Sequence, residues 1–177
     1  MMIKDTRDRY GAVSRVLHWS MALAFFALFA LGWWMVGLDY YSPYYKSAPD
    51  LHRSLGLLVL LALVVRIAWR LINVKPNDDD LSPLERTASR AVHHGFYPLL
   101  IVLLVSGYLI STADGRAIDV YGWFSVPAVV AAPGLEDAAG LVHAWSAYAV
   151  MALAVVHSAA ALKHRYWDVT DGRHRMW

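Results

Sequence analysis

The chain has 177 residues, of which 58% are hydrophobic and 17% charged, with a formal net charge of +2 and no cysteine. An ordinary soluble domain is about 45–50% apolar and about 25% charged, so this composition argues against that class and indicates a membrane protein. The small net charge gives no reason to expect a nucleic-acid partner, and the lack of cysteine excludes disulfides and thiolate metal sites.

The first apolar block covers residues 16–38 and contains no charged residue. It exceeds the roughly 20 residues that a membrane-spanning helix needs. A basic stretch precedes it, as in a secretory signal, but a signal has an apolar core of only about 7–15 residues and a small-residue cleavage site. We therefore predict a retained span. The segment "YYSPYY" (40–45) follows, with four tyrosines suited to the aromatic belt at a membrane surface.

The second block is interrupted by charge, because only "SLGLLVLLALVV" lies between Arg53 and Arg66. The apolar pattern resumes after Arg66, and an arginine near the end of a membrane helix can extend its charge to the interface. We predict the second span over 51–70. The polar, proline-containing stretch 73–83 predicts a turn region, in which the "DDD" run fits a solvated loop better than a metal site.

Two further uncharged blocks predict spans over 93–113 and 138–162. Between them, the apolar segment 117–132 is broken by Gly122 and Pro127. We predict that this segment lies on the outer membrane surface or caps the bundle, and is not a fifth span. The predicted fold class is all-α: an integral membrane four-helix bundle that forms a single membrane domain over 1–177.

Basic residues predict the orientation of the bundle. Thirteen of the 16 Lys and Arg residues fall in the N-terminal segment, in the connection between spans two and three, and in the C-terminal tail. The remaining three are Lys46, Arg53 and Arg116. Under the positive-inside rule, both termini of this multi-pass protein are therefore predicted to be cytoplasmic.

Four histidines sort by depth into two pairs. The alternating spans put His18 and His157 toward the cytoplasmic side, and His52 and His143 toward the outer side. His143 and His157 are fourteen residues apart, which in a helix is about 21 Å and about 3.9 turns, so they lie on nearly one face. Polar residues at such depth are costly and suggest a function.

Two neutral imidazoles from facing helices are the axial ligands that a b-type haem requires. The pairs therefore favour two haem b groups, an inner one held by His18 and His157 and an outer one held by His52 and His143. Gly56, one turn from His52, would leave room beside a flat macrocycle, although close helix packing accounts for it equally well. Zinc would need four ligands in one tight tetrahedron.

Roles without haem stay open for these histidines. They could be hydrogen-bonding residues at the membrane interface, or a proton relay in a transporter or channel. No carboxylate lies within the spans to continue such a relay.

Three stretches resemble the prokaryotic cytochrome b561 family. They are "RYGAVSRVLHWSMAL" in the first span, "LHRSLGLLVLLALVVRIAWRL" in the second, and "VHAWSAYAVMALAVVHSAAALKHRYW" in the fourth. The resemblance implies a four-helix membrane cytochrome with two haem b groups, whose ligands match His18, His52, His143 and His157. One branch of the family acts as a superoxide oxidase, which passes electrons from superoxide at the outer face to ubiquinone.

The resemblance also implies a protein of the bacterial inner membrane and a role for His164, which matches a histidine that one branch of the family associates with the quinone. Apart from the resemblance, His164, His93 and His94 are placed to supply protons at the inner end, since histidine exchanges protons near neutral pH. Arg53 and Arg116 could attract superoxide, although Arg53 could equally pair with a haem propionate.

Three candidate functions therefore remain. The first is a superoxide:ubiquinone oxidoreductase, and the second is a cytochrome b subunit that docks a dehydrogenase, a hydrogenase or a periplasmic redox partner. The third is a transporter or channel without haem.

Overall fold

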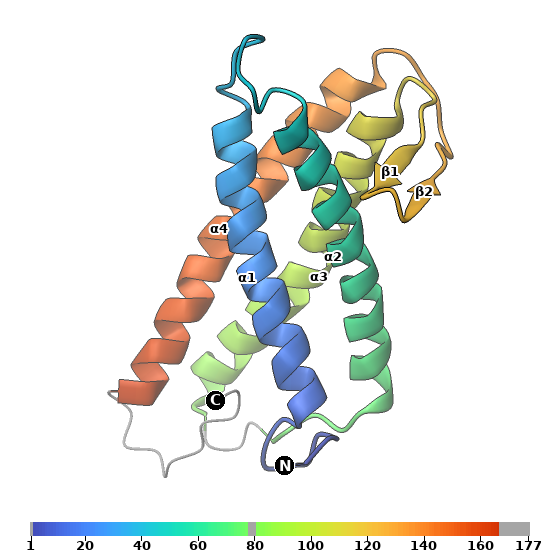
Figure 1. Cartoon of the computed structure of the whole chain (residues 1–177). Helices are drawn as coiled ribbons and strands as arrows, with labels where there is room; N and C mark the ends of the chain where they lie inside the picture. The colour runs from blue at the N-terminus through green and yellow to red at the C-terminus, as the bar shows by residue number, and fades with distance from the viewer. Residues whose placement is uncertain (1, 78–80, 167–177) are drawn as a thin grey trace.

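Four long helices form the molecule, with one short β-hairpin (Figure 1). The computed structural model describes residues 2–77 and 81–166. The helices are α1 (Ala12–Met35), α2 (Ser47–Ile72), α3 (Pro83–Thr112) and α4 (Leu135–Tyr166). The strands are β1 (Ile118–Val120) and β2 (Phe124–Val126). The "DDD" run and the tail residues Arg173, His174 and Arg175 lie outside the described residues.

The helices run up and down, so that α1 begins and α4 ends at the same end of the bundle (Figure 1). The closest packing joins consecutive helices, α1 with α2 and α3 with α4, while the contacts between these two helical hairpins run mainly between α2 and α3. A buried apolar cluster drawn from all four helices closes the middle of the bundle; its members are Met21, Leu28, Val59, Leu63, Leu100, Leu103, Leu104 and Val150. Because this apolar cluster fills the middle of the bundle, polar side chains lie toward its two ends.

The outward faces of the helices are apolar, which a water-soluble bundle would not tolerate. Leu23, Leu61 and Val155 have exposed fractions of 73%, 59% and 62%. All four helices are long and apolar enough to cross a membrane. Because exposed apolar surface on this scale is stable only against lipid, the predicted integral membrane four-helix bundle is confirmed.

The helices are longer than the predicted spans, most of all α3. We predicted the third span from residue 93 and a turn region up to 83, whereas α3 begins at Pro83. The Ser82 hydroxyl accepts a hydrogen bond from the Glu85 backbone N–H, and the Glu85 carboxylate accepts from the Ser82 N–H. This capping box starts the helix, and the sequence signal for it, Ser82-Pro83 followed by Glu85, was outside the uncharged block that we used.

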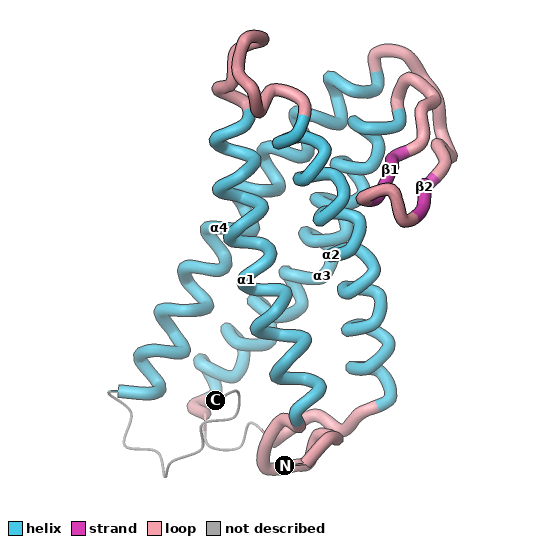
Figure 2. The backbone as a smooth tube through the Cα atoms, viewed as in Figure 1, coloured by secondary structure: helices cyan, strands magenta, loops and turns pink. Residues whose placement is uncertain are grey.

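The outer connection folds into a β-hairpin that the sequence did not predict (Figure 2). Ile118 pairs with Val126 and Val120 with Phe124, in strands too short to show an alternating pattern. The Ser54 hydroxyl on α2 donates to the Asp119 carbonyl at 3.2 Å, which fastens the hairpin to the bundle. The segment 117–132 thus packs against the outer ends of the helices, and its contact with the membrane surface stays a prediction.

Candidate functional site

The structure brings the four histidines together in the two pairs that the topology predicted. The rings of His52 on α2 and His143 on α4 have centroids 6.1 Å apart. The rings of His18 on α1 and His157 on α4 are also 6.1 Å apart. Each pair joins α4 to a helix of the other hairpin, so both sites lie between the two helical hairpins.

Both pairs leave room for a metal ion between the rings. Bonds from a metal to imidazole nitrogen are about 2.0–2.1 Å long, so two imidazoles on one ion have their ligating nitrogens about 4 Å apart. Centroids at 6.1 Å are compatible with that separation. In the described part of the chain no three His, Cys, Asp or Glu side chains gather around one point, so a bare ion would find too few ligands. Two imidazoles suffice for an iron whose other four ligands come from a porphyrin.

Glycine brings a helix backbone against each outer ring. A Cβ atom on Gly32 of α1 would lie 3.1 Å from His52 Cε1, and one on Gly107 of α3 would lie 2.9 Å from His143 Cε1. The sequence singled out Gly56 instead, but a Cβ there would meet nothing within 4 Å. Gly32 and Gly107 are single glycines within apolar helices. Whether they face the histidines depends on how each helix is rotated about its axis, which the sequence does not show.

Hydrogen bonds orient the outer rings differently. His143 Nδ1 donates to the Leu103 carbonyl at 2.9 Å, which leaves Nε2 unprotonated in the neutral ring and available as a ligand. His52 Nδ1 is buried and, among the residues described here, has no hydrogen-bond partner. A buried nitrogen without a hydrogen-bond partner costs about 1–3 kcal/mol of stability. The unpartnered Nδ1 of His52 therefore supports the binding of a further group at this site.

The inner pair has additional polar neighbours. His93 of α3 lies 5.2 Å from His157 between ring centroids, and its Nδ1 donates to the Ser89 carbonyl at 2.7 Å. We had placed His93 at the entrance of the third span, but the early start of α3 puts it ten residues inside the helix. Arg66 Nη2 lies 3.1 Å from His18 Nδ1 and can only donate to it.

His94 and His164 are the other histidines that the structure describes. His94 Nδ1 donates to the Arg90 carbonyl within α3. His164 is half-buried in the last turn of α4. Next to it, Lys163 Nζ binds Glu85 Oε1 at 2.9 Å and ties the end of α4 to the beginning of α3.

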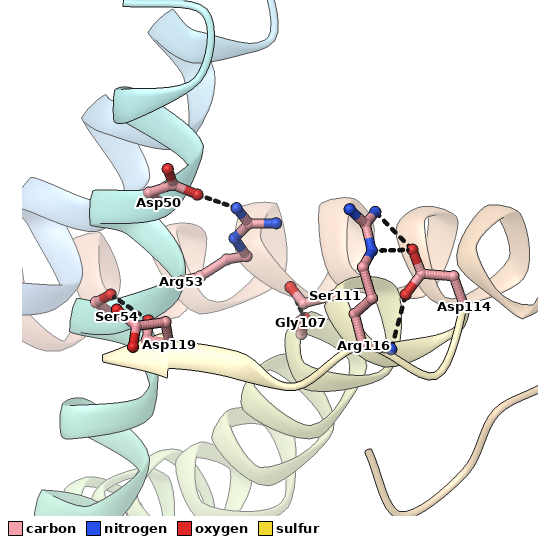
Figure 3. Close-up of polar contacts among 8 residues, drawn as sticks. All are labelled: Asp50, Arg53, Ser54, Gly107, Ser111, Asp114, Arg116 and Asp119. Carbon is pink, nitrogen blue, oxygen red and sulfur yellow. Dashed lines mark hydrogen bonds and ion pairs between the residues drawn. The ribbon is translucent and has the colours of Figure 1, made fainter. Parts of the chain in front are cut away.

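A cleft of about 420 Å³ opens beside the outer pair, between α2, the end of α3 and the β-hairpin. Arg53 and Arg116 both line it, together with Ser54 and Ser111 (Figure 3). Arg53 directly follows His52 in α2, and the Ser111 hydroxyl donates to the Gly107 carbonyl at 3.0 Å. The cleft therefore lies near the outer pair: Ser111 is one helical turn from Gly107, whose backbone lies against His143, and Arg53 is the neighbour of His52 in the chain.

Each arginine of the cleft is paired with a carboxylate. Arg53 forms an ion pair with Asp50, and Arg116 with Asp114 (Figure 3). The backbone N–H and the guanidinium of Arg116 hold the pKa of the Asp114 carboxyl below its usual value. The positive charge that the sequence offered for attracting an anion is thus partly offset.

Comparison with known proteins shows which family the chain resembles. The family model described as prokaryotic cytochrome b561 matches residues 9–177. The chain is also 46% identical, over 178 residues, to cytochrome b561 homolog 2 of Escherichia coli (strain K12), with 99% of this chain and 95% of that protein covered.

The close approach of Gly107 to His143 generates a prediction. Gly107→Ala should weaken retention of haem roughly tenfold, because a Cβ 2.9 Å from Cε1 forces the His143 ring out of place and overpacking of this kind costs about 1–3 kcal/mol. Haem per chain after dilution in detergent is the measurement. Gly140→Ala, on the same helix as His143, is the matched control, since its Cβ would meet nothing within 4 Å. Equal haem retention in both variants would contradict the prediction.

Proposed function

The chain belongs to the prokaryotic cytochrome b561 family of membrane electron-transfer proteins, which typically bind haem b, and we propose that it passes electrons from superoxide to membrane ubiquinone. Two superoxide ions lose one electron each and leave as dioxygen, while ubiquinone takes up two electrons and two protons. The observation that carries the proposal is the presence of two imidazole pairs toward opposite ends of one bundle.

Each pair would hold one haem b. His52 and His143 would be the axial ligands of the outer haem, and His18 and His157 those of the inner haem. Haem b supplies one-electron transfer when bound, and the protein sets its potential by ligation, hydrogen bonding and burial. The chain's own contribution is to fix the imidazoles at two depths, separated along α4 by about 21 Å.

The proposed direction is inward. The distribution of basic residues supports cytoplasmic ends of the chain, which would turn the β-hairpin and the cleft to the outside of the inner membrane. Superoxide would enter the cleft, where Arg53 and Arg116 retain N–H donors beyond those used by Asp50 and Asp114.

The quinone would bind at the inner end of the bundle, near His164. This side chain is half-buried in the last turn of α4. His164 would donate a hydrogen bond to a quinone oxygen and later a proton, which is chemistry available to histidine near neutral pH.

Superoxide-driven reduction tests this function directly. Purified protein in liposomes with ubiquinone should form ubiquinol when superoxide is generated outside, without any added protein partner, because donor and acceptor sites lie on one chain. Ubiquinol is measured by chromatography, and superoxide dismutase should abolish it. If the haems are present but reduce only after a redox protein is added, the chain acts as a subunit that docks a partner.

The ligand assignment predicts which haem each histidine holds. Wild-type protein should contain two non-covalent haems per chain with low-spin spectra. His52→Ala and His143→Ala should remove one spectral component, and His18→Ala and His157→Ala the other. His93→Ala is the control, because His93 lies even closer to His157 than His18 does. Loss of the inner component in His93→Ala but not in His18→Ala would assign the inner ligand to His93.

The quinone site predicts a selective defect. His164→Ala should leave haem content and reduction by superoxide intact, because the ligands are untouched. Re-oxidation of the haems by ubiquinone should slow by at least tenfold, which is about 1.4 kcal/mol of barrier. His164→Gln separates the two roles of the imidazole, since glutamine keeps a hydrogen bond but cannot supply a proton. An unchanged rate of re-oxidation in His164→Ala would exclude His164 from the quinone site.

A further inference from the structure

Arg66 is an arginine within the membrane-spanning helix α2, and its hydrogen bond goes to a candidate haem ligand. Its Nη2 atom lies 3.1 Å from His18 Nδ1, in a partly buried position more than one turn before α2 ends at Ile72. It also lines a small cavity of about 30 Å³ with Tyr10 and Ser14. An arginine near the end of a membrane helix can extend its charge to the interface, whereas the guanidinium of Arg66 is directed at His18.

No ion pair within the described residues neutralises Arg66. Arg70, one turn further along α2, donates to the Tyr10 hydroxyl at 3.2 Å and adds a second positive charge. The buried carboxylate of Asp5 accepts hydrogen bonds from the Gly11 N–H and the Ser14 hydroxyl, both at 2.7 Å, and interacts electrostatically with Arg70. Among residues 2–77 and 81–166, no carboxylate forms a salt bridge with Arg66. The two arginines therefore bring more positive charge to the inner histidine pair than the one carboxylate of Asp5 offsets.

In the described part of the chain, no hydrogen bond joins a cation to His52 or His143. The two arginines of the cleft, Arg53 and Arg116, form ion pairs with Asp50 and Asp114. Their side chains are also open to water, with exposed fractions of 40% and 83%. Water and the paired carboxylates screen these charges far more than the surroundings of Arg66 screen its own.

We propose that Arg66 raises the reduction potential of the inner haem above that of the outer haem, so that the electron moves inward downhill. This rests on the proposed ligand assignment. Reduction of a haem adds one electron and removes one positive charge from the iron, so a fixed cation nearby favours the reduced form. The transfer itself moves a single electron between the two irons, and no bond forms or breaks in the protein.

The hydrogen bond from Arg66 to His18 changes when His18 binds a metal, but the charge stays in place. If iron is bound through Nε2, the His18 proton lies on Nδ1, which then cannot accept from Arg66. The guanidinium remains protonated at any physiological pH, and the polar cavity that it lines offers the hydroxyl oxygens of Tyr10 and Ser14 as acceptors. Arg66 is in this role a positioning residue that acts through the field at the inner ring.

Redox titration of the purified protein, followed by the spectra of the two haems, tests the inference. Arg66→Gln should lower the inner midpoint potential by at least about 59 mV, a tenfold change in the one-electron equilibrium, and leave the outer midpoint unchanged. Arg66→Lys, which keeps the charge, should restore most of the difference. Arg53→Gln is the matched control: it removes an arginine directly beside the other ligand on α2, yet it should move the outer midpoint by less than a third as much.

An unchanged inner midpoint in Arg66→Gln, with both haems present, would overturn the inference while leaving the ligand assignment and the superoxide function standing. If Arg66→Gln loses the inner haem, Leu17→Glu is the second test, because it introduces a carboxylate into the same cavity with Arg66 in place. The inner midpoint should then fall, and an unchanged value would overturn the inference. Failure of superoxide to reduce either haem would reject the proposed donor without affecting the midpoints.

Discussion

Both histidine pairs depend on one helix, because α4 contributes a ring to each of them. The spacing between His143 and His157 keeps the two rings on nearly one side of α4 and about 21 Å apart, so that one straight helix faces α2 near one end and α1 near the other. A polar ring is costly in a lipid-facing bundle unless it is turned inward, so the position of α4 fixes where the other three helices can pack.

The helices accommodate the two histidine pairs by packing as two helical hairpins. Contacts are densest within the α1–α2 and α3–α4 hairpins, and the imidazole pairs lie between the two hairpins, where direct contacts are fewer. Gly32 and Gly107 let the backbones of α1 and α3 pass against the outer rings, where an added Cβ would lie 3.1 Å from His52 Cε1 and 2.9 Å from His143 Cε1. The buried apolar cluster holds the middle of the bundle together. The residues around one histidine pair can therefore differ from those around the other while the bundle keeps its fold.

The two ends of the bundle differ in charge as well as in depth. One end pairs its arginines with carboxylates in an open cleft. At the other end Arg66 and Arg70 are partly buried, their hydrogen bonds in the described structure go to an imidazole and a hydroxyl, and the one carboxylate of Asp5 lies near them. Charges that are weakly screened have the larger effect on a neighbouring redox centre. This difference gives the molecule an electrostatic direction that its nearly symmetric pairs of histidines lack.

The sequence by itself determined the number of membrane helices, their approximate extents and the pairing of the histidines, because long uncharged blocks and fixed helical rise leave few alternatives. It missed the early start of α3 and the β-hairpin, whose signals are short and local. Only the tertiary structure decided that Gly32 and Gly107 face the outer rings, that His93 lies beside His157, and that Arg66 reaches His18. These contacts depend on how each helix is rotated about its axis, and helices that are apolar on every side carry no pattern in their sequence that fixes this rotation.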